Sequence, residues 1–148
     1  MTNLTRLQEL DRQGTTDTPE ARELALTVYE KELPTHQCYW NDRLYIAIRF
    51  GLDKERQRRA VVNSVVTNGR TGYFEQRTHF DFNNRSLLEC LGVPVTLLPQ
   101  FSDTPLDYQN LDEEVIRRVA KKFEIDLDNT SELRRLQGDF YHSHGAGF

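Results

Sequence analysis

The amino-acid sequence predicts an α+β fold in which a small antiparallel sheet from the middle third is packed by N- and C-terminal helices. Apolar residues recur every three or four positions near both ends of the chain, which is typical of amphipathic helices. In the middle third they alternate with polar residues, which is typical of half-buried strands. A chain of 148 residues can bury a core without disulfides or metal ions. We therefore expect one domain over residues 1–140 and a flexible tail over residues 141–148.

Two helices are predicted in the N-terminal part. Leucines recur every three residues over positions 4–12, which predicts a short helix. Thr18 followed by Pro19 is a helix-start signal, because the hydroxyl can cap the first turn and proline needs no amide hydrogen there. Pro34 predicts the end of this second helix.

Two strands are predicted in the middle third. Residues 44–50 alternate apolar and other side chains, and residues 74–82 place phenylalanines on one face and charged groups on the other. The segment between them, residues 53–67, is ambiguous because its first half favours helix and its valines favour strand. If residues 61–67 are a strand, residues 68–72 form a hairpin loop. If they are a helix, the Asn-Gly pair at position 68 is its stop signal; we favour the strand.

Helices return towards the C-terminus. Leucines over residues 87–91 predict a short helix that Gly92 closes. Asn110 with Glu113 predicts a capped start for the most strongly amphipathic helix of the chain. A last short helix is predicted over residues 131–137.

Composition excludes several classes of protein. No run approaches the roughly 20 apolar residues that cross a bilayer, so we expect no membrane association. The polar N-terminus lacks the apolar core of a secretory signal, and two cysteines, Cys38 and Cys90, are too few for a disulfide scaffold. These features predict a cytoplasmic protein.

The charge distribution provides the main functional hypothesis. The net charge is −4, yet residues 48–85 carry eight basic and four acidic side chains. Such a basic segment predicts a surface that binds a macromolecular partner, namely a protein with an acidic surface or, as the alternative, a nucleic acid. Trp40 is added to the candidate binding residues because tryptophan is enriched at interface hot spots, although one tryptophan in a small domain is more often in the core. The candidate binding residues are Arg49, Lys54, Arg56, Arg58, Arg59, Arg70, Arg77 and Trp40.

A small enzyme is the third hypothesis. On the predicted strand over residues 74–82, His79 shares a face with Asp81 and Glu75, and a neighbouring carboxylate can orient an imidazole for acid–base catalysis. Alternating charges are also ordinary on the wet face of a sheet. We therefore expect a non-catalytic interaction or regulatory protein in preference to an enzyme.

No metal ion or cofactor is predicted. Four side chains have the chemistry of zinc ligands, but their H-x-C and H-x-H spacings differ from those of structural zinc motifs. These residues are His36, Cys38, His142 and His144.

Overall fold

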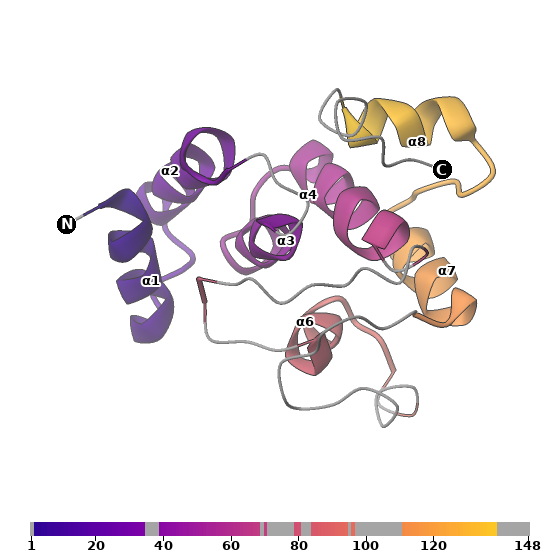
Figure 1. The fold of residues 1–148 in the computed structure, drawn as a ribbon. Helices are drawn as coiled ribbons and strands as arrows, with labels where there is room; N and C mark the ends of the chain where they lie inside the picture. The colour runs from indigo at the N-terminus through magenta and orange to yellow at the C-terminus, as the bar shows by residue number, and fades with distance from the viewer. Residues whose placement is uncertain are drawn as a thin grey trace.

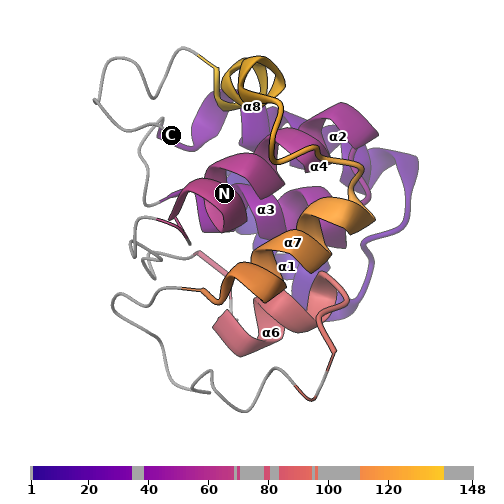
Figure 2. The same cartoon turned by 90° about the vertical axis from the view of Figure 1, so that its right-hand side faces the viewer.

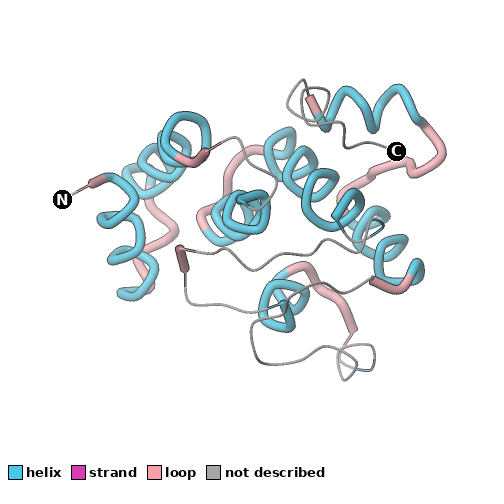
Figure 3. Tube along the Cα trace, in the orientation of Figure 1, coloured by secondary structure: helices cyan, strands magenta, loops and turns pink. Residues whose placement is uncertain are grey.

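The described part of the fold is all-helical. The computed structural model describes residues 2–34, 39–68, 70, 79–80, 84–94, 96 and 111–138, and no strand occurs among them (Figures 1 and 3). The predicted α+β fold with a central antiparallel sheet is therefore wrong. None of the helices in these ranges is both long enough and apolar enough to cross a membrane.

Seven α-helices make up most of the described part. They are α1 (Asn3–Gln13), α2 (Pro19–Thr27), α3 (Trp40–Arg49), α4 (Lys54–Val61), α6 (Asn84–Cys90), α7 (Glu113–Lys122) and α8 (Thr130–Gln137). Two π-helical segments, η1 (Val28–Glu32) and η3 (Val62–Asn68), continue α2 and α4 directly. α1 and α2 pack together at one end, and α3 lies in the centre against η1, α4 and α6 (Figure 1). Viewed from the right-hand side of Figure 1, α8, α7 and α6 follow one another from top to bottom (Figure 2).

Local signals place the N-terminal helices where the sequence predicts them. The Thr18 hydroxyl accepts the Ala21 amide at 3.0 Å and Pro19 opens α2, so this start signal is confirmed. α1 ends at Gly14, whose φ of 74° is the left-handed conformation that glycine adopts without a Cβ clash. η1 ends at Glu32, two residues before Pro34.

α3 replaces the strand predicted over residues 44–50. Its side chains are buried on almost every side, because the helix lies between η1, α4 and α6. Only Tyr45, Ile48 and Arg49 are not buried, so the polar side of the helix is narrow, and the chance alternation of leucine, isoleucine and phenylalanine resembles the two-residue period of a strand. Even its polar residues Asn41, Asp42 and Arg43 are buried, at 1%, 0% and 4% exposure.

α4 and η3 occupy the segment over residues 53–67 that the sequence left ambiguous. Residues 54–68 are helical throughout, and residues 60–67 are completely or almost completely buried. The strand favoured for residues 61–67 is therefore wrong. Valine favours strands because its branched side chain packs well on a sheet, but packing against α3, α7 and α8 overrides that preference here.

The C-terminal helices are confirmed, with one shift at a cap. α6 ends just before Gly92, and Gly138, at a φ of 74°, follows α8. α7 begins after Asp112, whereas the predicted capping residue Asn110 lies outside the described residues. The predicted tail over residues 141–148 also lies outside them. So does the predicted strand over residues 74–82 except for positions 79 and 80, which are not in a strand.

A buried arginine closes the end of η1. The Arg43 guanidinium donates to the main-chain carbonyls of Leu33 at 2.9 Å, Pro34 at 3.0 Å and Tyr29 at 3.3 Å. It also lies 4.9 Å from the ring centroid of Trp40. A helix end leaves carbonyl groups without partners, and a cation there stabilises them. This contact fastens α3 to the end of η1.

Candidate functional site

The basic segment does not present free positive charge in the part that the structure describes. Each basic residue of residues 48–85 whose side chain is described forms an ion pair of 3.8 Å or less with a carboxylate. The pairs are Arg49 with Asp11, Lys54 with Glu124, Arg56 with Glu30 and Asp53, Arg58 with Glu132, Arg59 with Glu55, and Arg70 with Glu113. The positions of the Arg77 and Arg85 side chains lie outside the described residues.

These ion pairs join α4 to other parts of the fold. Arg56 reaches Glu30 of η1, and Arg58 reaches Glu132 of α8 while donating to the Phe123 carbonyl after α7. Arg135 of α8 reaches back to Glu55 of α4 at 2.6 Å. The ion pairs form three separate groups, which together contain equal numbers of acids and bases. The groups are Lys54 with Glu124, Arg56 with Glu30 and Asp53, and Arg58, Arg59 and Arg135 with Glu55 and Glu132.

Trp40 lies in the core and not on the surface. Its side chain is 6% exposed and meets the Tyr29 ring edge-on, with the two ring centroids 6.5 Å apart. Trp40 and the paired arginines of α4 are therefore not brought together on one open face.

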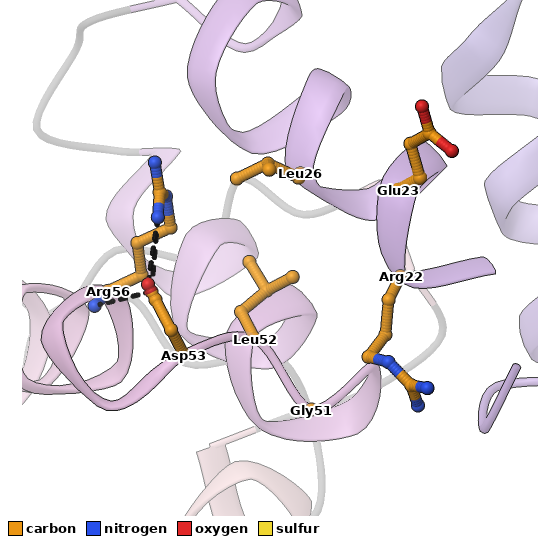
Figure 4. A pocket seen from close by; sticks show the side chains of 7 residues that line it. All are labelled: Arg22, Glu23, Leu26, Gly51, Leu52, Asp53 and Arg56. Atoms are coloured by element: carbon orange, nitrogen blue, oxygen red, sulfur yellow. Dashed lines mark hydrogen bonds and ion pairs between the residues drawn. The ribbon is translucent and has the colours of Figure 1, made fainter. Parts of the chain in front are cut away.

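A hollow beside α2 has an apolar floor and a charged rim (Figure 4). Leu26 of α2 faces Leu52, which follows α3, across a space of about 280 Å³. The rim is charged, with Arg22 and Glu23 on one side and Asp53 and Arg56 on the other. Leu26 is only half-buried, so an apolar side chain remains accessible between charged groups.

A second hollow lies on the other side of the exposed face of α2. It has a volume of about 320 Å³ between α1 and α2, and Leu10 and Leu24 supply its apolar surface. Its polar lining consists of Asn3, Arg6, Glu20, Glu23 and Thr27. Glu23 lines both hollows, so its side chain lies between them on the exposed face of α2. We refer to the two hollows together as the α2 groove.

His79 is held by the buried carboxylate of Asp42, a residue that was not predicted as its partner. The Asp42 carboxylate accepts the His79 backbone amide at 2.8 Å and lies 2.7 Å from the ring Nδ1. The His79 ring stacks on Tyr39 with a centroid distance of 5.5 Å, and its side chain is 34% exposed. Burial raises the pKa of Asp42, against the lowering effect of its hydrogen bonds to His79. The predicted partners Asp81 and Glu75 lie outside the described residues.

No reactive cysteine or metal centre emerges among the described residues. Burial raises the pKa of the Cys90 thiol, which keeps it in its less nucleophilic form. No cluster of three or more histidine, cysteine, aspartate or glutamate side chains there has the geometry of a metal site. The four candidate zinc ligands, His36, Cys38, His142 and His144, lie outside the described residues.

Sequence reasoning missed the α2 groove and the Asp42–His79 pair. Leu26 was the available signal for the groove, because it lies off the apolar stripe that Ala21, Ala25 and Val28 bury in the core. The pairing of Asp42 with His79 had no local signal, since 37 positions separate the two residues.

The chain was compared with known proteins. No protein-family model matches it, and comparison with curated proteins and with solved structures gives no match either.

Proposed function

We propose that the protein is a non-catalytic binding module that docks a segment of another protein in the α2 groove. The observation that carries this proposal is the accessible apolar floor, in which half-buried Leu26 faces Leu52 beneath a charged rim. Interfaces combine such an apolar centre with a polar rim, since the centre supplies most of the binding free energy and the rim gives orientation.

A protein partner is favoured over a nucleic acid. Nucleic-acid binding depends on basic side chains that replace the counterions of phosphates. The basic side chains of α4 already bind carboxylates of the protein itself, in ion pairs whose acids and bases are equal in number. Nucleic-acid binding remains an alternative that heparin retention over a salt series tests, because such binding weakens steeply as salt rises.

Acid–base chemistry at His79 is the second candidate function. The contact between its Nδ1 and buried Asp42 is the arrangement that orients an imidazole in many hydrolases. A panel of chromogenic esters and phosphate esters tests this function. Activity that is lost in both His79→Gln and Asp42→Asn supports it, and a panel without turnover argues against it.

Site-specific photo-crosslinking in cells tests the docking function. A photoreactive phenylalanine analogue at position 26 is expected to form a crosslink with one discrete partner, because the side chain lines the groove. The same analogue at Arg118, an exposed position on α7, is the matched control and is expected to give no such crosslink.

Competition then establishes whether the crosslink depends on the groove. Added wild-type protein is expected to abolish the crosslink, whereas Leu26→Glu protein is expected not to, because a carboxylate disrupts the apolar floor. A thermal melt of Leu26→Glu verifies that the variant is folded. Equal crosslinking from positions 26 and 118, or equal competition by both proteins, would overturn the proposed function.

A further inference from the structure

The charged side chains of the α2 groove that have no ion-pair partner among the described residues are carboxylates. Glu20 and Glu23 lie one helical turn apart on the exposed face of α2, and neither has a cationic partner among the described residues. The basic groups that line the groove are already engaged. Arg22 binds Asp17 at 2.8 Å, Arg56 binds Asp53 at 2.8 Å, and Arg6 lies 3.7 Å from Glu9.

The carboxylate of Glu23 lies between the apolar surfaces of the two hollows. On one side of it lie Leu10 and Leu24, and on the other lie Leu26 and Leu52. A chain that crosses the exposed face of α2 would therefore meet a carboxylate between two apolar hollows. A positively charged side chain at that point gains from both carboxylates, while a negatively charged one is repelled by them.

We infer that the occupant of the α2 groove is a protein segment with a lysine or arginine flanked on both sides by apolar side chains. This inference rests on the proposed docking function and specifies the chemistry of the partner. It differs from the sequence-based expectation of an acidic partner, because the arginines behind that expectation are bound within the fold. The charges of the groove that are unpaired in the described part of the chain lie on α2, because Arg56 of α4 is paired with Asp53.

Selection from a random dodecapeptide library tests the inference. The full-length protein is immobilised, and each enriched peptide is then tested against Leu26→Glu to identify the peptides whose binding depends on the groove. These peptides are expected to carry net positive charge, with apolar residues on both sides of a basic one.

The charge dependence is measured with one selected peptide. Replacing both carboxylates, in Glu20→Gln/Glu23→Gln, is expected to weaken its binding about fivefold at low salt, since exposed ion pairs each contribute roughly 0.2–1 kcal/mol. Glu89→Gln on α6 is the matched control, because Glu89 is exposed and has no ion pair among the described residues. It is expected to leave the affinity unchanged.

The outcomes separate this inference from the proposed function. Groove-dependent peptides that are acidic or neutral, or an affinity that the double variant leaves unchanged, overturn the inference and leave the docking function standing. A selection without any peptide that depends on Leu26 overturns the inference, and the crosslinking experiment then decides the docking function separately. An oligonucleotide that binds the groove in competition with the selected peptide also overturns it.

Discussion

The carboxylate of Asp42 binds His79 twice, through the backbone amide at 2.8 Å and through the ring Nδ1 at 2.7 Å. Asp42 is completely buried in the first turn of α3, and the carbonyl of His79 accepts a hydrogen bond from Gln8 of α1. Phe80, the next residue, packs on Tyr45 with ring centroids 5.2 Å apart. These contacts hold residues 79–80 against α1 and α3.

Asp42→Asn is expected to destabilise the protein. Asparagine replaces one of the two carboxylate oxygens with an NH2 group, which cannot accept a hydrogen bond from a protonated Nδ1 of His79. Loss of a buried acceptor costs about 1–3 kcal/mol in the free energy of unfolding, which urea denaturation measures. Asp128→Asn is the control, because this carboxylate is exposed. It is expected to change stability by less than about 0.5 kcal/mol. Equal stability of the two variants would contradict the structural role of Asp42.

Arg43→Met is expected to lower the free energy of unfolding by about 3 kcal/mol, because three main-chain carbonyls at the end of η1 lose their donor. Arg43→Lys is expected to fall between this variant and the wild type, since lysine keeps the charge but lacks the planar fork of donors. Urea denaturation followed by the fluorescence of the single tryptophan, which lies beside Arg43, measures both. A lysine variant as unstable as the methionine variant would show that charge contributes nothing.

Gly14→Ala is expected to cost about 1 kcal/mol in the free energy of unfolding. The cost is purely conformational, because φ is 74° and no heavy atom lies within 4 Å of the position that a Cβ would take. Gly14→Asn is expected to cost less, since asparagine tolerates the left-handed region better than alanine does. Thermal or urea denaturation of the two variants provides the comparison. An alanine variant as stable as wild type would contradict the left-handed end of α1.

Acid is expected to destabilise the protein partly through Glu132. Hydrogen bonds from Arg135 lower the pKa of Glu132 from 4.5 to about 2 in the folded protein. The folded state therefore favours the ionised form. Its stabilising contribution is complete above about pH 4.5 and is lost as the pH falls towards 2. Unfolding free energies measured across this range are expected to fall less steeply in Glu132→Gln than in the wild type.

Asp42 contributes to the pH dependence of the free energy of unfolding with the opposite sign. Its pKa is raised, so the folded state favours the protonated carboxyl, and its stabilising contribution is lost as the pH rises through the folded-state value.

Parallel pH profiles for Glu132→Gln and wild type would contradict the assigned role of Glu132. The Glu89→Gln variant, which removes an exposed carboxylate elsewhere, is the control.

Helix ends were predictable because their signals are local. The Thr18 hydroxyl caps an amide three residues away, and Gly138 follows α8 at a positive φ of 74°, which residues other than glycine rarely adopt. α7 was predictable for a related reason. It lies at the surface, so only Val115, Ile116, Val119 and Ala120 are buried, and they form a stripe with helical spacing.

The central helices were not predictable from the same kind of pattern. α3 and η3 are buried on nearly all sides, so few polar residues mark a solvent-facing side from which a helical period could be recognised. The arginines of α4 were predicted to face a partner, and this prediction failed to anticipate their ion pairs for a similar reason. Whether an arginine is free for a partner depends on carboxylates far away in the chain, such as Glu30 for Arg56 and Glu132 for Arg58.

The sequence by itself therefore determined where several helices begin and end, and which face of α7 is buried. Capping groups, glycine conformations and one-sided stripes act over a few neighbouring residues, so a linear pattern contains them. Only the tertiary structure decided that residues 44–50 are helical, that the arginines of α4 are neutralised, and that Leu26 meets Leu52 in a groove. Burial and charge pairing are set by groups remote in sequence, which only folding brings within contact distance.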